Sequence, residues 1–386
     1  MNTEKTFKII DDNSGKYIDF LAKICSYEAR AKDKEVIDKM MTYVEEYADS
    51  EGMQVKRIPF EKCGDCLLIE INAGAEKSFT LHAHMDTVHD AGIFGEEPVK
   101  IEGDKMTAPG TIDCKGGAAV ALLAMKALKE AGYQKNIRLL LNTDEEITNS
   151  LGGEKEQQLI RDTIDGFKAS LNCETGRENG VVVSRSGILR MEVDITGIGG
   201  HSGAAYFQGA SAILEASHKI IELESKSRKD GSTFNCSLIK GGTVANNIPD
   251  NCQFTVDIRV NTVKDMEEAE RYVYEIAERV HIPGTSAKAN IVSKRPPMEK
   301  SEKSVKLFEI IKKVYNDLGY GEIEPLHTRG GSDSAYTQLA GIPSICAMGP
   351  WGDFGHTNKE YVNLHTVAER AKVIACFAIN NLEENI

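Results

Sequence analysis

Residues 80–90 read TLHAHMDTVHD and place three histidines and two aspartates directly after a short apolar strand, Phe79 to Leu81. Such a run is compatible with surface polarity, with a proton relay or with one corner of a metal site. In open α/β sheets, ligands bind outside the carboxyl ends of the strands. The choice among the three therefore depends on whether carboxylates and histidines elsewhere in the chain also follow strands.

Four other segments carry such side chains at an expected strand end or helix start. They are GTIDCKGG with Asp113, LLLNTDEE with Glu145 and Glu146, SLNCETG with Glu174, and GDFGHTNKE with His356. Taken singly each signal is weak, and His82 and His89 of the opening stretch are interpreted as bystanders. The matching positions together predict one site at one edge of a sheet.

Two histidines and three carboxylates, one of them bridging, suit a pair of zinc ions, because Zn²⁺ binds imidazole and carboxylate readily. Cobalt or manganese could replace zinc, since affinity alone does not select the metal. Glu145 and Glu146 are adjacent and cannot point the same way from a strand end. One of them can therefore bind a metal while the other reaches the metal-bound water as general base.

Helices that alternate with buried strands predict an α/β fold with a large mixed, mostly parallel sheet and helices on both faces. The continuous apolar run IRLLLN, residues 137–142, is typical of a strand covered on both sides. The Ala-rich helix that starts near residue 116 ends at Gly132. The α/β pattern returns after Pro297, with a helix expected at 302–317 and a last amphipathic helix at 364–382.

The pattern changes near Gly187. The segments LRMEVDI (189–195) and CQFTVDIRV (252–260) alternate between apolar and polar residues, as antiparallel strands with one exposed face do. Helices are expected at 209–224 and 265–280, and the order β-α-β-β-α-β predicts a small α+β ferredoxin-like domain. The expected division is a catalytic domain of residues 1–186 and 295–386, with residues 187–294 inserted as a lid or dimerisation domain.

Composition limits the function classes. A chain of 386 residues is too long for one simple core and favours two domains. The net charge of −13 argues against nucleic-acid binding, which needs a basic face. No apolar run approaches the roughly 20 residues that span a bilayer, so no membrane role is expected. The N-terminal MNTEKTFKIIDD lacks the apolar region of a secretory signal, and a cytoplasmic location is expected.

One pair of cysteines, Cys63 and Cys66, has CxxC spacing. It could be half of a zinc knuckle or a redox pair, or a Gly-Asp hairpin turn flanked by two cysteines that are there by chance. No second CxxC exists to complete four thiol ligands, so the sequence favours the turn.

A family resemblance rests on a series of motifs that covers nearly the whole chain. They are HAHMDTV, DCKGGAAVALLAMKAL, NTDEE, CETG, GIGGHSG, GGTVANNIPDNCQFTVDIRV and GHTNKEYV. In this order they resemble the dinuclear-zinc exopeptidase and deacylase family. That family includes glutamate carboxypeptidase, peptidase T, acetylornithine deacetylase, succinyl-diaminopimelate desuccinylase and aminoacylase. The resemblance implies amide hydrolysis through a bridging hydroxide and a glutamate general base.

The resemblance also implies roles for single residues. His84 and Glu174 resemble the ligands of one zinc, Glu146 and His356 those of the other, and Asp113 the bridging ligand. Asp86 resembles the group that orients the imidazole of His84, and Glu145 resembles the general base. Cys114 departs from the family, which usually has Asp or Asn there. The Asp113–Cys114 peptide bond is expected to be cis.

In the inserted domain, His201 matches a histidine that polarises the scissile carbonyl, supplied by the other subunit in dimeric relatives. Asn246 and Arg259 match residues that hold the substrate carboxylate or the oxyanion, although Arg259 could equally form a surface salt bridge with Asp257. Arg329, in HTRGGSDSAY, resembles peptidase T and could also meet a carboxylate. A homodimer formed through the inserted domain is expected.

The resemblance favours release of a C-terminal amino acid from a short peptide or an N-acyl amino acid. Glu174, in place of Asp, and the stretch HMDTVHDAGIFGEEP fit the carboxypeptidase branch. A peptidase T-like aminotripeptidase and an N-acyl-amino-acid deacylase are the alternatives. A non-catalytic metal- or peptide-binding homologue is the alternative of a different class, and loss of Glu145 or of a ligand would mark it.

Overall fold

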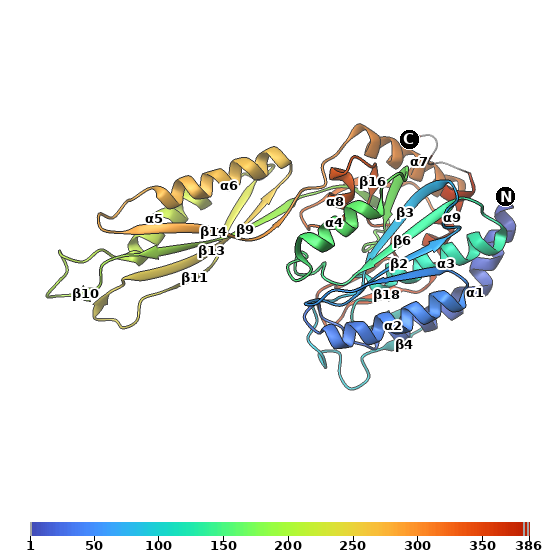
Figure 1. Ribbon diagram of the computed structural model, residues 1–386, viewed down its shortest axis with the longest axis horizontal. Coiled ribbons are helices and arrows are strands. Elements are labelled where there is room, and N and C mark those ends of the chain that lie inside the picture. The colour runs from blue at the N-terminus through green and yellow to red at the C-terminus, as the bar shows by residue number, and fades with distance from the viewer. Residues whose placement is uncertain (1, 381–382, 384–385) are drawn as a thin grey trace. The chain divides into compact units, whose positions relative to one another are not determined.

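The computed structural model describes residues 2–380, 383 and 386 of the chain, which divide into two compact units (Figure 1). The first comprises Met1–Val183, Lys300–His327 and Tyr336–Ile386, and the second comprises Ser184–Glu299 and Thr328–Ala335. The segment Thr328–Ala335 lies outside the range expected for the inserted domain. Backbone contacts within the second unit explain its place, because Ser186 N–H donates to Thr328 O at 2.9 Å.

A six-stranded mixed sheet forms the centre of the first unit. Its strand order is β1 (Gln54–Ile58), β2 (Cys66–Ile71), β6 (Asn136–Asn142), β3 (Lys77–His84), β7 (Ala169–Asn172) and β16 (Ser344–Ile345). Strands β6, β3, β7 and β16 pair in parallel, while β1 and β2 pair antiparallel at one edge. The predicted mixed, mostly parallel sheet is confirmed, and the carboxyl ends of its parallel strands meet at one edge.

Helices cover both faces of this sheet, as predicted. Neighbouring residues on β6 show this directly, because Leu139 and Leu141 belong to the main core while Leu140 packs into a separate apolar cluster with Ile160. The helices of the unit are α1 (Thr3–Cys25), α2 (Lys34–Ser50), α3 (Lys115–Ala131), α4 (Gly153–Thr163), α7 (Glu302–Asp317), α9 (His365–Ile379) and all but the first two residues of α8 (Ser334–Leu339). Of the last helix expected at 364–382, residues 381 and 382 lie outside the described residues.

Helix α3 occupies the middle of the main core. Its alanines and leucines are buried on almost every side, and it packs against α1, α9 and β3. Ala has the highest helix propensity and leaves room for close approach of neighbouring backbones. The helix ends at Gly132, whose φ of 93° is the left-handed conformation that glycine adopts readily. The start of this helix therefore has a fixed position, directly after Asp113 and Cys114.

Short strands complete the first unit. A four-stranded sheet has the order β17 (Gly352–Asp353), β18 (Tyr361–Asn363), β5 (Lys105–Thr107) and β4 (Lys100–Glu102). Strand β8 (Gly180–Arg185) pairs with β15 (Glu324–Thr328). His356 lies in the loop between β17 and β18. Among the described residues, no helix has both the length and the apolar character needed to cross a bilayer.

The second unit is an antiparallel sheet with two helices. The strand order is β11 (Thr233–Gly241), β13 (Asn251–Val260), β9 (Gly187–Thr196) and β14 (Ser286–Arg295), with α5 (Ala212–Glu224) and α6 (Val263–Glu278) packed against it. This β-α-β-β-α-β unit confirms the ferredoxin-like prediction. Strand β11 had no clear sequence signal, because it lies at the sheet edge and is mostly exposed. A small ribbon pairs β10 (Gly200–His201) with β12 (Asn247–Ile248).

Candidate metal centre

Asp113 lies between two histidines from opposite ends of the chain. His84 Nε2 is 3.1 Å from Asp113 Oδ1, and His356 Nε2 is 3.1 Å from Asp113 Oδ2. The two oxygens of one carboxylate thus face two different imidazoles. A carboxylate that bridges two cations needs this arrangement, with one oxygen directed to each ion.

Asp86 fixes the orientation of His84 at the end of β3. His84 Nδ1 is 3.1 Å from Asp86 O and 3.4 Å from Asp86 Oδ1, so its Nε2 is turned towards Asp113. The carboxylate of Asp86 also accepts the backbone N–H of Glu145 and of Glu146, at 3.3 and 3.0 Å. One fully buried aspartate therefore positions a histidine and the turn that carries both glutamates.

The two adjacent glutamates both lie near His84, but Glu146 is grouped with Asp113 and Glu145 with Glu174. Glu146 Oε2 is 3.5 Å from His356 Nε2, whereas donor atoms of Glu145, His84 and Glu174 all lie within 4.8 Å of one another. Glu174 Oε1 is 4.0 Å from His84 Nε2. Glu145 and Glu174 are buried, with exposed fractions of 7% and 5%. The structure thus brings all five predicted ligands and Glu145 into one cluster.

The charges in this cluster fit a pair of divalent cations. Burial, together with the carboxylate of Asp113, raises the pKa of Glu146 well above its usual value. The hydrogen bond to Asp113 raises the pKa of His356. Burial favours the neutral acid at Asp113, but its hydrogen bonds with His356 and His84 outweigh burial and lower the pKa of Asp113. Carboxylates this close compete for protons, and cations would take the place of those protons.

The predicted cis peptide bond between Asp113 and Cys114 is confirmed. The thiol of Cys114 is fully buried and accepts the backbone N–H of His84 at 3.2 Å. Burial raises the pKa of Cys114 to about 12, so the group is a thiol rather than a thiolate near neutral pH. This side chain packs beneath the site and is not poised as a nucleophile.

Sequence reasoning missed Glu360, which holds the loop that carries Asp113. Its fully buried carboxylate accepts the backbone N–H of Ile112 at 2.9 Å and those of Gly110 and Asp113 at 3.3 Å. The Nε2 of His89, a residue interpreted as a bystander, lies 2.8 Å from Glu360 Oε2. The only signal in the sequence was the position of Glu360 four residues after His356.

In the second unit, His201 and Asn246 lie side by side. His201 pairs with Asn247 across the β10–β12 ribbon, and Ser202 N–H donates to Asn246 O at 2.9 Å. His201 Nδ1 accepts the backbone N–H of Gly203 and of Ala204, at 3.1 and 3.2 Å. The ring proton is therefore on Nε2, which is exposed and can donate to a ligand.

Arg259 and Arg329 lie together at the other end of the same sheet. Arg259 Nη1 donates to Arg329 O at 3.4 Å, and its Nε donates to Asp257 Oδ1 at 2.7 Å. The salt bridge with Asp257, which the sequence left as an alternative, is present. Strand β13 begins at Asn251, three residues after the ribbon that carries His201, and Arg259 lies near its other end. At roughly 3.3 Å per residue, Asn251 and Arg259 are about 26 Å apart. The second unit therefore does not bring Arg259 and Arg329 to His201.

Comparison with known proteins agrees with the geometry. A model of the peptidase family M20/M25/M40 matches residues 80–380. Carboxypeptidase G2 of Pseudomonas sp. (strain RS-16) is 31% identical over 378 residues, which cover 96% of this chain and 90% of that protein. Two crystal structures, aminopeptidase PepT from Bacillus cereus and an M20 family metallo-carboxypeptidase from Sulfolobus solfataricus, share the fold. Each has a TM-score of 0.75 and covers 96% of this chain and 99% of its own, at 19% and 15% identity.

The motif series, the fold and the clustered donors all indicate the same protein family. The resemblance read from the sequence is confirmed by a family match that spans most of the chain and by a relative similar over nearly its full length. The chain belongs to the M20/M25/M40 peptidase family and is a hydrolase of amide bonds.

Proposed function

We propose that this protein is a dinuclear zinc exopeptidase that releases a C-terminal amino acid from short peptides or N-acyl amino acids. The observation that supports it is the carboxylate of Asp113, whose two oxygens each lie 3.1 Å from a different histidine. In this proposal His84 and Glu174 hold one ion, Glu146 and His356 hold the other, and Asp113 is shared. Zinc is preferred, with cobalt or manganese as substitutes.

When bound, the two ions would supply the Lewis acidity that activates a water and polarises the scissile carbonyl. Glu145 is buried beside the same donors and acts as general base, taking a proton from the water and returning it to the leaving nitrogen. Asp86 keeps the imidazole of His84 in one orientation. His201, protonated at Nε2, donates to the developing oxyanion.

Three polar side chains of the second unit are proposed to bind substrate. Asn246 lies beside His201 at the β10–β12 ribbon and, like His201, would reach the substrate from the second chain of the proposed homodimer, to contact the oxyanion or a substrate oxygen. Arg259 and Arg329 carry guanidinium groups, which pair with carboxylates in bidentate geometry. The salt bridge of Arg259 with Asp257 would have to open or be shared for such a contact. A free C-terminal carboxylate is the chemical feature that these arginines would select.

The carboxypeptidase assignment is supported by the similarity to Carboxypeptidase G2 over nearly the whole chain. The fold shared with aminopeptidase PepT keeps a peptidase T-like aminotripeptidase as the second candidate, and succinyl-diaminopimelate desuccinylase relatives keep a deacylase as the third. A non-catalytic binding homologue is disfavoured, because Glu145 and every proposed ligand are present.

A substrate screen distinguishes these candidates. The purified protein, loaded with zinc or cobalt, is incubated with dipeptides, tripeptides and N-acyl amino acids, and products are identified by mass spectrometry. Release of the C-terminal residue from both N-acyl amino acids and peptides is expected. Release of the N-terminal residue from tripeptides alone would replace the proposal with the aminotripeptidase. Metal binding without turnover of any substrate would favour the binding homologue.

We further propose a homodimer formed through the second unit. Large apolar side chains are exposed on α5 and on the neighbouring edge strand β11, namely Ile221 (67%), Leu238 (67%) and Ile239 (57%). Light scattering should give twice the mass of one chain, and Leu238→Glu should shift the measured mass towards that of the single chain.

A cytoplasmic location is also proposed. Buried free thiols such as those of Cys25 and Cys173 support a reducing compartment of this kind.

A further inference from the structure

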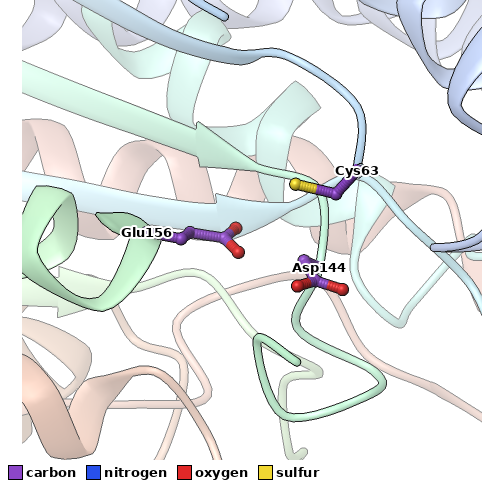
Figure 2. Close-up of side chains that lie close together, drawn as sticks. All are labelled: Cys63, Asp144 and Glu156. Atoms are coloured by element: carbon purple, nitrogen blue, oxygen red, sulfur yellow. The ribbon is translucent and has the colours of Figure 1, made fainter. Parts of the chain in front are cut away.

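A second group of possible metal donors lies in the first unit, apart from the five residues around Asp113. It consists of two thiols and two carboxylates and is called here the thiol–carboxylate cluster: Cys63, Cys66, Asp144 and Glu156. One donor atom from each of Cys63, Asp144 and Glu156 lies within 4.8 Å of the other two. Cys66 Sγ is 3.9 Å from Glu156 Oε1. Figure 2 shows Glu156 directed from α4 towards Cys63 and Asp144.

The cluster is buried and surrounded by apolar side chains. All four of its residues have exposed fractions of 0%. Cys63 and Cys66 belong to the same apolar cluster as Phe60, Leu140 and Tyr336. Carboxylates in such surroundings are costly unless hydrogen bonds, protons or a cation compensate their charge. Burial, with the carboxylates of Glu156 and Asp144 nearby, raises the pKa of Cys63 to about 12.

Two glycines, which have no side chain, allow the close packing around these donors. A Cβ on Gly64 would lie 2.1 Å from Ile37 Cγ2, and one on Gly152 would lie 2.3 Å from Glu156 Oε2. Thr143 Oγ1 donates to Gly64 O at 2.6 Å, which ties the CxxC turn to the end of β6. The backbone N–H groups of Leu151 and Gly152 each lie 2.7 Å from Asp144 Oδ2. Two regions that are distant in sequence, the CxxC turn and residues 143–156, thus converge on one small volume.

We infer that the thiol–carboxylate cluster binds one structural zinc ion. Cys63, Asp144 and Glu156 supply three mutually close donors, and Cys66, whose Sγ lies 3.9 Å from Glu156 Oε1, is the proposed fourth. Four donors are the number that structural zinc sites use, and C-x₂-C is a common spacing of zinc ligands. Thiolates exclude the hard cations Mg²⁺ and Ca²⁺, which prefer oxygen. Zinc binding would release the thiol protons of Cys63 and Cys66 to solvent. The ion would link the CxxC turn to α4 and to Asp144, the residue before the general base.

Cobalt substitution tests this inference independently of peptidase activity. The proposed catalytic donors are nitrogen and oxygen only, whereas a Co²⁺ ion held by cysteine gives a thiolate-to-metal charge-transfer band in the near ultraviolet. The cobalt-loaded wild type is expected to show this band, and Cys63→Ser should lose most of it. Asp113→Asn, which disrupts the shared carboxylate of the catalytic centre, should retain it.

A matched control separates the cluster from the thiol beneath the catalytic centre. Cys114→Ser removes a cysteine that is equally buried and should leave the band unchanged. Elemental analysis of zinc-grown protein should find one zinc equivalent fewer in Cys63→Ser than in wild type. A cobalt-loaded wild type without the band, or a band that survives Cys63→Ser and disappears in Cys114→Ser, would overturn the inference. If Cys63→Ser does not fold, the charge-transfer band is compared between the wild type and Cys114→Ser alone. A band present in both supports the inference, and a band absent from the wild type or lost in Cys114→Ser overturns it.

Discussion

His356 Nε2 lies 3.1 Å from Asp113 Oδ2, although 243 residues separate the two in the sequence. His356 adopts a φ of 62°, a left-handed conformation that is uncommon for a residue other than glycine. It lies in the loop between β17 and β18, whose pairing brings Asp353 opposite Tyr361. A strained, exposed residue that faces a partly buried carboxylate is typical of a functional site.

Asp113→Asn should abolish metal binding at the proposed centre with little change in fold. The amide retains the size of the carboxylate but loses its charge and offers one oxygen in place of two, so one imidazole loses its shared partner. We expect the catalytic zinc content to fall to near zero and turnover to drop at least about 100-fold. Elemental analysis and steady-state kinetics measure this. Asp230→Asn, at an exposed position, is the control and should behave as wild type.

Glu145→Gln should separate metal binding from catalysis. The residue is the proposed base rather than a ligand, so both ions should remain while turnover falls by roughly 10²–10⁴. The neighbouring Glu146→Gln should lose metal as well as activity, since Glu146 Oε2 lies 3.5 Å from His356. Wild-type turnover in Glu145→Gln would remove this residue from the mechanism.

Glu360→Gln should weaken metal affinity through the loop that carries Asp113. The carboxylate now accepts the N–H of Gly110 on Oε2 and that of Ile112 on Oε1, whereas the amide has one oxygen and would turn its NH₂ group towards one of these two donors. We expect a loss of about 10–100-fold in zinc affinity, with turnover restored by excess zinc. Activity measured against zinc concentration tests this. A lower melting temperature with an unchanged zinc dependence would show that Glu360 acts on stability alone.

The stability of the second unit should depend on the ionisation of Glu215. Burial opposes its charge, but Lys219 and the backbone N–H groups of His281 and Ile282 outweigh burial and lower the pKa of Glu215 below 4.5. A carboxyl group with a lowered folded-state pKa stabilises fully above its unfolded pKa. Its contribution is therefore lost as the pH falls from 4.5 through the lower folded value. Urea unfolding at a series of pH values measures this loss.

Glu215→Gln should remove this acid dependence and destabilise the unit at neutral pH. Lys219 is 1% exposed and would lose its charged partner, a change that costs about 3–5 kcal/mol for a buried pair. Glu278→Gln, on the exposed surface of α6, should leave both the stability and its pH dependence unchanged. An identical acid dependence in Glu215→Gln would contradict the assignment.

Much of the fold was accessible from local patterns. The buried run at 137–142 and the alternating segment at 252–260 predicted strands with different exposure, and β6 and β13 lie there. The predicted order β-α-β-β-α-β required a strand before residue 252, but its position was not predicted, because an exposed edge strand such as β11 needs no alternation of apolar and polar residues. The extension of the second unit to Thr328–Ala335 escaped because it depends on backbone hydrogen bonds between distant segments.

For the site, the sequence by itself determined which side chains lie at a strand end or at a helix start, because such a position depends on near neighbours in the chain. His84, Asp113 and Glu174 were therefore candidates from the sequence, and the family resemblance assigned each of them to a metal ion. Only the tertiary structure decided that Glu360 supports Asp113, that Arg259 lies far from His201, and that Glu156 reaches Cys63. These relations join segments that are distant along the chain, and strand order and packing set them rather than any local periodicity.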